Sequence, residues 1–477
     1  MRRTRDPGAD VANAVKMARV DGSGVSGARD ETTAGRSFWR VLLLIVLAGI
    51  GLRVGYVLTV TQHDHGFYDA AFYEFEARSV ADGRGFVYPL PSVQSGRPAA
   101  DHPPLTVLAL VPAAELSGNS RLWMRFTMVA LGAAVVLLVG LLGRALAGPR
   151  IGLTAAGLAA VYANLWLNDG LLMSETLAAL TTVAALLLAY RHLRRPSWRL
   201  AAALGVVCGL AALARAELVL LVPLLALPAA WVAHRRVVGR LEMAAAVLAG
   251  AVLVVGPWVG YNLARFQEPT FVSTGDGVAL LGANCGVAYH PPLLGLWAVG
   301  CLPPHAPPGD ESVVNLDYRN QATSYLRHHL GEVPVVALAR LGRLLGVYNP
   351  GQIARYNAGE GRPRWASYLG ITSFLLLLPF AVGGFVWLRR RRVRVWPLLA
   401  PVWVVLVSAV AFYGTPRFRV PAEPVAVTLA AVGAWALVAR WRPDLAAPGV
   451  GGSVAAQDRT ARAGQAVGAA SPAGPAI

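Results

Sequence analysis

The chain has 477 residues, of which 55% are hydrophobic and 14% are charged, whereas soluble domains carry about 25% charged residues. This composition excludes an ordinary soluble enzyme. A net charge of +17 would suit a nucleic-acid-binding protein, but such proteins gather their cations on a solvated polar face. Here the cations interrupt apolar runs, so no nucleic-acid partner is expected.

The two ends of the chain differ from the rest. Residues 1–37 and 441–477 are polar and rich in Gly, Ala and Arg, and they are expected to be disordered cytoplasmic tails. The first tail lacks the apolar stretch of a signal peptide, so the first membrane helix is expected to remain as an anchor. Residues 38–440 are predicted to form one membrane domain.

Apolar runs between the tails predict an all-α polytopic membrane protein with about ten to twelve transmembrane helices. A membrane helix needs about 20 mostly apolar residues. Ten runs meet this pattern, at 41–60, 122–143, 151–167, 171–190, 200–214, 216–233, 243–262, 366–388, 395–413 and 421–439. The shorter segment 102–117 contains Pro112 and Glu115. It is either a further span or a re-entrant element.

Arginine-rich loops predict the orientation, because short cytoplasmic loops carry an excess of Lys and Arg. The loops at 144–150, 191–199, 234–240 and 389–394 hold fourteen arginines and no acidic residue. All four lie on one side if 102–117 does not cross, and both termini are then cytoplasmic. Two long loops, 61–101 and 263–364, would face outside the cytoplasm. We therefore expect a multi-pass plasma-membrane protein whose active site faces outward.

The first outer loop is acidic and carries candidate site residues. Asp69, Tyr73 and Glu76 are spaced by four and three, which places them on one face of a helix. Such a face could meet a substrate at the lipid surface, or it could be the solvated face of an interfacial helix. Next, His102 stands before two prolines where the chain returns to the membrane. It could bind a phosphate, or simply mark a rigid helix start.

Further charges fall at the outer ends of predicted spans, where ionisable residues are functional candidates. Glu175, Arg215 and Glu217 form one such group, and a structural pair of Glu175 with Arg215 is the alternative. Arg417 and Arg419 make a short outer loop cationic, against the orientation rule. Arginine suits bidentate contact with phosphate. Snorkelling to lipid head groups is the other interpretation.

Cys285 and Cys301 both fall in the second outer loop. A disulfide between them is favoured in an oxidising exterior compartment. Two unpaired thiols are the alternative.

Taken in order, these residues resemble the GT-C superfamily of integral membrane glycosyltransferases. The family 39 type, which includes protein O-mannosyltransferases and the lipid A aminoarabinose transferase, is most similar, and actinobacterial members look nearest. The resemblance runs from about residue 38 to 440. It rests on Tyr68-Asp69-Ala70-Ala71-Phe72-Tyr73, Ala81-Asp82-Gly83-Arg84-Gly85-Phe86, His102-Pro103-Pro104-Leu105, Met173-Ser174-Glu175, Arg215-Ala216-Glu217, Pro257-Trp258 with Asn262, Gly282-Ala283-Asn284-Cys285 and Pro416-Arg417-Phe418-Arg419.

The resemblance implies transfer of a hexosyl or pentosyl group from a polyprenyl-phosphate sugar to a cell-envelope acceptor, within the membrane lipid. Asp69 falls on the family's catalytic position and would act as general base, with inversion at the sugar. Arg417 and Arg419 would bind the donor phosphate. Supporting residues would be Tyr68, Tyr73, Glu76, His102, Glu175, Arg215 and Glu217.

Metal dependence and function class stay open at this point. Many relatives carry Glu after the catalytic Asp, whereas this chain has Ala70, which weakens the case for a divalent metal cofactor without removing it. A transporter or flippase of a lipid-linked sugar is the alternative function. Transporters often show two related halves, and no such repeat is visible in this sequence.

Overall fold

The computed structural model describes residues 22–62, 69–91 and 94–442. Within these ranges the chain is built from helices, and the strand-like pairing is an isolated bridge between Val87 and Pro98. The predicted all-α architecture is therefore confirmed. Tyr68 lies outside the described residues.

The helices of the first half run from the N-terminal membrane helix to the arginine-rich loop at 234–240. They are α2 (Gly22–Tyr56), η1 (Val57–Thr61), α3 (Asp69–Ala81), α4 (Leu105–Leu116), α5 (Arg121–Ala147), α6 (Pro149–Val161), α7 (Ala163–Asp169), α8 (Glu175–Arg194), α9 (Trp198–Ala214), η2 (Ala216–Leu220), η3 (Val222–Ala226) and α10 (Leu227–Ala233).

The second half contains the large outer loop and the last membrane helices. Its elements are α11 (Val237–Arg265), α12 (Asp276–Ala283), α13 (Gly286–Tyr289), η4 (Val299–Cys301), α14 (Glu311–His328), α15 (Val333–Leu345), α16 (Pro350–Gly359), α17 (Arg364–Arg390), α18 (Trp396–Ala411), η5 (Pro416–Ala422) and α19 (Glu423–Trp441).

Helices coincide with all ten predicted membrane spans. Among the described residues, seven helical stretches are long and apolar enough to cross a membrane, and the pair α6 and α7, bent by 54°, makes an eighth if it is counted as one span. Two more, α9 and α18, are apolar but shorter. The predicted run at 171–190 begins late, because α8 starts at Glu175.

Helix α4 does not reach across the bundle. Its 12 residues measure about 18 Å, less than the roughly 30 Å of a hydrocarbon core. Helix α5 follows α4, and its first residue, Arg121, has Nε 2.5 Å from Glu74 Oε2 of α3. The chain is therefore at the same end of the bundle before and after α4. Of the two interpretations of 102–117, the structure has the one that does not cross.

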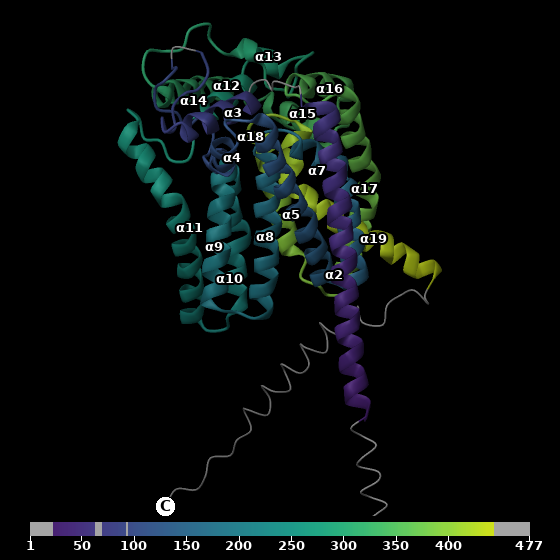
Figure 1. Cartoon of the computed structure of the whole chain (residues 1–477). Helices are drawn as coiled ribbons and strands as arrows, with labels where there is room; N and C mark the ends of the chain where they lie inside the picture. The colour runs from purple at the N-terminus through teal and green to yellow at the C-terminus, as the bar shows by residue number, and fades with distance from the viewer. Residues whose placement is uncertain (1–21, 63–68, 92–93, 443–477) are drawn as a thin grey trace, which may run out of the picture.

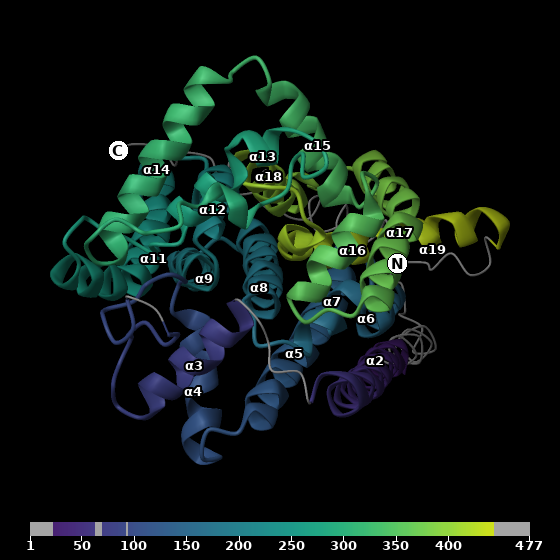
Figure 2. The same cartoon turned by 90° about the horizontal axis from the view of Figure 1, so that it is seen from above.

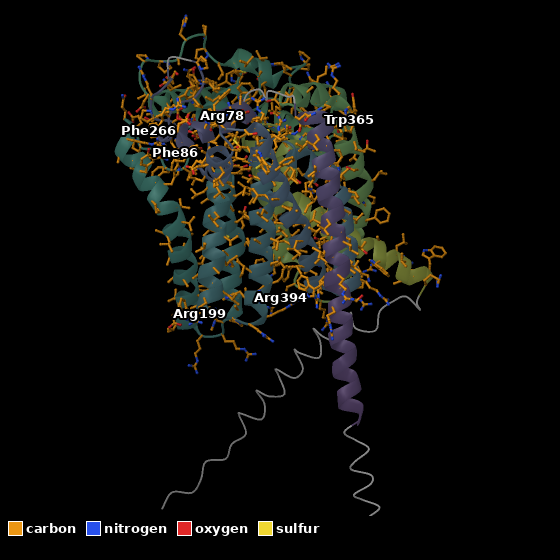
Figure 3. All side chains as sticks on the ribbon, viewed as in Figure 1. Arg78, Phe86, Arg199, Phe266, Trp365 and Arg394 are labelled. Carbon is orange, nitrogen blue, oxygen red and sulfur yellow. A yellow bond between two sulfur atoms is a disulfide. The ribbon has the colours of Figure 1, made fainter. Side chains whose placement is uncertain are left out.

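The bundle has two distinct ends (Figure 1). The short helices α3, α4 and α12–α16 gather at one, which we call the cavity end. Arg199 and Arg394 lie at the other, the arginine-rich end, away from Arg78 and Phe266 (Figure 3). Tyr190 Oη donates to Arg394 O at 2.7 Å and joins two of the arginine-rich loops there. These loops thus share one end, as their charge pattern predicts.

Small residues and one buried ion pair hold the spans together. A Cβ at Gly205 of α9 would lie 2.0 Å from Val247 O of α11, so these helices approach closely only because that side chain is absent. Deep in the bundle, Arg53 Nε lies 2.6 Å from Asp169 Oδ2, and Thr176 Oγ1 donates to Asp169 Oδ1 at 2.7 Å. The two charges form an ion pair, and Arg53 Nη1 also donates to Gly49 O and Ala160 O, which makes their burial tolerable.

Helix α2 (Gly22–Tyr56) starts well before the first predicted span at 41–60. Extending an existing helix avoids the cost of nucleation, so polar residues can add to a span that forms for other reasons.

The two outer loops are joined at the cavity end, which faces the viewer in Figure 2. Glu311 of α14 accepts hydrogen bonds from Ala100 N at 2.8 Å and from Thr274 Oγ1 at 2.9 Å. Thr274 N donates to Ala100 O at 2.7 Å. These bonds fix the segment that carries Asp101 and His102.

Candidate active site

A cavity of about 840 Å³ opens at the cavity end. Its wall combines both outer loops with the ends of several membrane helices. The ionisable side chains that line it, apart from tyrosines, are Asp69, Asp101, His102, Arg215, Glu217, Asp276, Arg355, Glu360 and Arg417. Pockets with a few convergent polar groups in a mostly apolar wall are the usual form of ligand sites.

Asp69 lies on the wall of this cavity as the first residue of α3. An acidic residue is favoured there by the positive end of the helix dipole. Its Oδ2 lies 2.5 Å from Arg417 Nη2, and its Oδ1 lies 3.7 Å from His102 Nε2. Burial by itself would raise the pKa of Asp69, but the positive charges of Arg417 and His102 hold that pKa well below its usual range. The carboxylate is therefore ionised, and about 30% of its side chain remains exposed.

Arg417 joins three carboxylates. Besides Asp69, its Nε is bonded to Glu175 Oε1, and its Nη1 lies 3.1 Å from Glu360 Oε1. A guanidinium carries five N–H groups in a planar fork. Three of them are used here, so Arg417 keeps two N–H groups for a further acceptor.

A second layer of ion pairs supports Arg417. Glu175 Oε1 also lies 3.2 Å from Arg215 Nη1 and 3.9 Å from Arg362 Nη2. The chain of charges continues on both sides, where Arg215 Nε lies 2.6 Å from Glu217 Oε1 and Arg362 Nη1 lies 2.5 Å from Glu360 Oε2. Such buried networks are costly to desolvate and are tolerated only when each charge is paired.

His102 lies between two carboxylates. Its Nε2 is 3.5 Å from Asp101 Oδ2, in addition to its contact with Asp69. The ring of Tyr73 stacks on the imidazole at 4.7 Å between centroids. Burial would lower the pKa of His102, but Asp101 and Asp69 outweigh it and raise the pKa to about 9. At neutral pH the imidazole is therefore a cation beside Asp69.

Most residues singled out in the sequence meet at this cavity. Asp69 and Tyr73 come from the first outer loop, and His102 directly follows it. They face Arg215, Glu217 and Arg417 from the ends of membrane helices, with Glu175 buried directly behind Arg417. Glu76 is buried but does not line the cavity.

Arg419 is not brought to the cavity. Residues 416–422 form the 3₁₀ helix η5, in which positions two apart point in well-separated directions. Its Nε lies 2.6 Å from Glu423 Oε1, and its Nη1 donates to Leu344 O at 2.7 Å. Glu423 also accepts from Tyr162 Oη at 2.6 Å. Arg419 thus belongs to a separate buried cluster, and a shared phosphate site with Arg417 is not formed.

The structure adds cavity residues that the sequence did not single out. They come from α16 and the turn after it, namely Arg355, Tyr356 and Glu360, with Arg362 behind them. The segment lies in a long loop with nearly balanced charge, so it carries no local signal. Arg355 is exposed at the cavity wall and makes no ion pair or hydrogen bond with the described part of the chain.

The donor set does not suit a divalent metal. No group of three or more His, Cys, Asp and Glu side chains that could hold an ion is found among residues 22–62, 69–91 and 94–442. Ala70 supplies no second carboxylate beside Asp69, and the guanidinium of Arg417 occupies the flank of Asp69 that a cation would use. We therefore derive no step through a metal.

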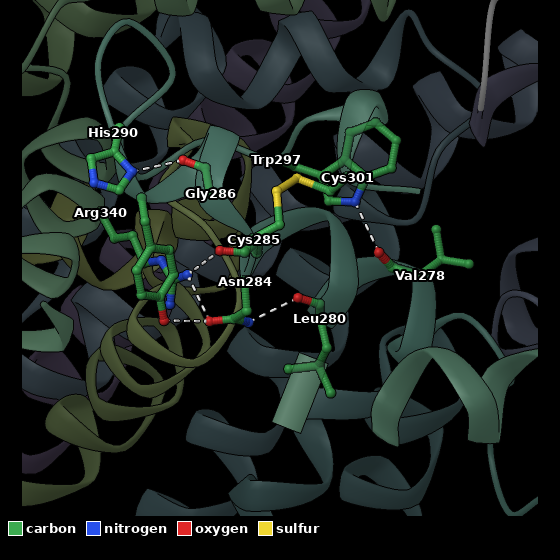
Figure 4. The surroundings of a disulfide bond; sticks show 11 residues. Val278, Leu280, Asn284, Cys285, Gly286, His290, Trp297, Cys301 and Arg340 are labelled. Carbon is green, nitrogen blue, oxygen red and sulfur yellow. Dashed lines mark hydrogen bonds between the residues drawn. A yellow bond between two sulfur atoms is a disulfide. The ribbon is translucent and has the colours of Figure 1, made fainter. Parts of the chain in front are cut away.

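A disulfide closes one wall of the cavity. Cys285 and Cys301 are bonded, with their Cα atoms 5.8 Å apart (Figure 4). Residues between them, including Leu293, Trp297 and Val299, line the same cavity as Asp69 and Arg417.

Residues 101–261 match the dolichyl-phosphate-mannose-protein mannosyltransferase family. Among solved structures, the Archaeoglobus fulgidus oligosaccharyltransferase AglB, in complex with an inhibitory peptide and a dolichol-phosphate, is 15% identical, with a TM-score of 0.53. This alignment covers 86% of this chain and 51% of AglB, so the chain spans about half the length of that protein. ArnT from Cupriavidus metallidurans, bound to undecaprenyl phosphate, is 16% identical over 86% of this chain and 79% of its own, with a TM-score of 0.38. No curated protein sequence matches the chain.

Proposed function

We propose that the chain is a membrane glycosyltransferase of the GT-C superfamily, and its fold and the family match over 101–261 support this proposal. Its donor would be a polyprenyl-phosphate sugar and its acceptor a hydroxyl-bearing molecule of the cell envelope. The observation that carries the proposal is the ionised Asp69 carboxylate on the cavity wall, 2.5 Å from Arg417.

Asp69 would act as general base. Its Oδ2 is held by Arg417, which leaves Oδ1 to accept the proton of an acceptor hydroxyl. A low pKa makes Asp69 a weak base. This suffices if the bond from the sugar to phosphate breaks ahead of the attack, because the electron-poor anomeric carbon then acidifies the incoming hydroxyl. Attack opposite the phosphate would invert the sugar.

Two arginines support a phosphate site. Arg417 retains two N–H groups, but its charge is already shared by three carboxylates. Arg355 has no such partner and lines the same cavity. We infer that Arg355 supplies the net charge that balances the leaving phosphate, while Arg417 holds Asp69 and offers direct hydrogen bonds.

The expected orientation in the membrane follows from the excess of arginine in the loops at the arginine-rich end. If that end faces the cytoplasm, the cavity opens at the outer surface of the plasma membrane. A membrane-impermeant thiol reagent, added to intact cells after reduction, would then label Cys285 and Cys301. Labelling only after permeabilisation would place the cavity on the cytoplasmic side.

Vesicles that contain the protein test the activity. They would receive a radiolabelled polyprenyl-phosphate sugar and an envelope extract as acceptor, and the label in the acceptor would be counted. We expect transfer by the wild type and a large loss in Asp69→Asn. Asp82→Asn, an exposed acid at the far end of α3, is the matched control. Equal transfer by wild type and Asp69→Asn would rule out Asp69 as the general base. Movement of intact donor across the membrane without transfer would indicate a transporter.

A further inference from the structure

The wall closed by the disulfide differs in character from the rest of the cavity. Elsewhere the cavity is lined by Asp69, Arg417 and other charged side chains, whereas this wall presents Leu293, Trp297 and Val299. Its largest side chain is Trp297, which is half-buried. An aromatic ring facing a polar constellation is a common arrangement for ligands with one apolar and one hydrogen-bonding face.

Trp297 is held in a single orientation. Its indole Nε1 donates to Val278 O at 3.0 Å (Figure 4). It packs directly on Gly282, where a Cβ would lie 2.0 Å from Nε1, so only glycine leaves room for the ring. The backbone beside the ring is also fixed, because Ala298 N donates to Gly282 O at 2.9 Å.

The segment that carries Trp297 is anchored at both ends and in the middle. The disulfide between Cys285 and Cys301 closes it, and Gly414 N donates to Gly295 O at 2.9 Å. Gly414 lies three residues before Arg417, so the wall and the ionic network share one support. The position of the ring relative to Asp69 is thus set before any ligand binds.

The polar atom of Trp297 is already used by Val278. What the side chain offers the cavity is therefore the ring itself, without a free donor. A sugar ring has faces of C–H groups and a rim of hydroxyls. Its C–H face can lie on an aromatic ring through dispersion and weak hydrogen bonds, while its hydroxyls reach polar groups that line the same cavity.

We propose that Trp297 is a specificity-determining residue on which a sugar ring stacks during transfer. The inference rests on the proposed glycosyltransferase function and identifies which wall of its cavity recognises the carbohydrate. The ring that binds there belongs either to the donor or to a glycan acceptor. A donor sugar and a glycan acceptor present the same kind of C–H face. Measuring KM for the donor and for the acceptor separately distinguishes between them.

The test compares Trp297→Ala with Trp297→Phe. Alanine removes the ring, whereas phenylalanine keeps a smaller aromatic face and loses the bond to Val278. We expect Trp297→Ala to raise KM about tenfold for one of the two substrates, with little change for the other and a smaller change in kcat. Trp297→Phe should recover most of the lost affinity. A donor KM that rises identifies the donor sugar, and an acceptor KM that rises identifies a glycan acceptor.

Three outcomes would overturn the inference. Unchanged KM values in Trp297→Ala would show that the ring contacts no substrate. Equal defects in the Ala and Phe variants, accompanied by a lower melting temperature in both, would show that Trp297 acts only by anchoring Val278. If the wild type transfers no sugar from any lipid-linked donor, the proposed function fails, and the inference fails with it; the first two outcomes leave the proposed function intact.

A second variant checks the role of the closed segment. The double change Cys285→Ser with Cys301→Ser leaves Trp297 in place but releases one of its anchors. The same substrate that responds to Trp297→Ala should show a raised KM, of about threefold to tenfold, in the folded double variant. A raised KM for the other substrate alone would contradict the assignment of Trp297 to the substrate identified with Trp297→Ala.

Discussion

Arg417→Lys is the most informative change in the ionic network, because it keeps the charge and alters only the geometry. Arginine meets Asp69, Glu175 and Glu360 with three different nitrogens of one planar group. Lysine offers a single nitrogen, which cannot reach three carboxylates placed around a fork. At least one charge-assisted hydrogen bond is lost, at about 1.5–3 kcal/mol each. A rise of about 3 kcal/mol in the barrier corresponds to roughly a hundredfold lower kcat.

The assay is sugar transfer from a saturating lipid-linked donor, with Arg419→Lys as the matched control. Arg419 is two residues away and equally buried, but it bonds to Glu423 and Leu344 outside the cavity. The control should therefore lose thermal stability while its folded fraction keeps kcat within about threefold of the wild type. Wild-type kcat in Arg417→Lys, or an equal loss in a fully folded Arg419→Lys, would refute the reasoning.

Three further predictions concern stability. Asp169→Leu should cost about 3–5 kcal/mol, since it leaves Arg53 buried without its partner, and the double change with Arg53→Met should recover much of the loss in a detergent melt. Loss of the Cys285–Cys301 bridge, which spans 16 residues, should cost about 3 kcal/mol, so that reductant lowers the melting temperature of the wild type but not of the double Ser variant. The pKa of His102 is raised from 6.5 to about 9. Its ion pairs therefore contribute fully to the free energy of unfolding below pH 6.5, and this contribution is lost as the pH rises through 9. The melting temperature of the wild type should therefore fall over this range, and that of His102→Gln should fall less.

The helical architecture could be predicted from the sequence because membrane spans are long apolar runs. The two places where charge departs from the general pattern, around Asp69 and Arg417, also proved to be neighbours in space. Composition within one segment was sufficient to predict the spans and to single out the segments around Asp69 and Arg417. The shared side of the arginine-rich loops follows from the same rule.

Other parts of the site depend on contacts that no local pattern encodes. Arg417 and Arg419 look equivalent in the sequence, and only the 3₁₀ turn of η5 separates their directions. Glu360 and Arg355 become site residues because α16 packs against α17 and Glu360 bonds to Arg417 of η5, and their own segment carries no unusual spacing or charge. Tertiary packing decides such positions, and a single sequence does not reveal it.

The central claim is that Asp69 accepts the proton of the acceptor hydroxyl during sugar transfer. Single-turnover transfer from a pre-bound polyprenyl-phosphate sugar measures that chemical step directly, free of binding and product release. Loss of a general base predicts a rate for Asp69→Asn that is about 10²- to 10⁴-fold below the wild type, with Asp82→Asn unchanged. A single-turnover rate of Asp69→Asn equal to that of the wild type would contradict the account.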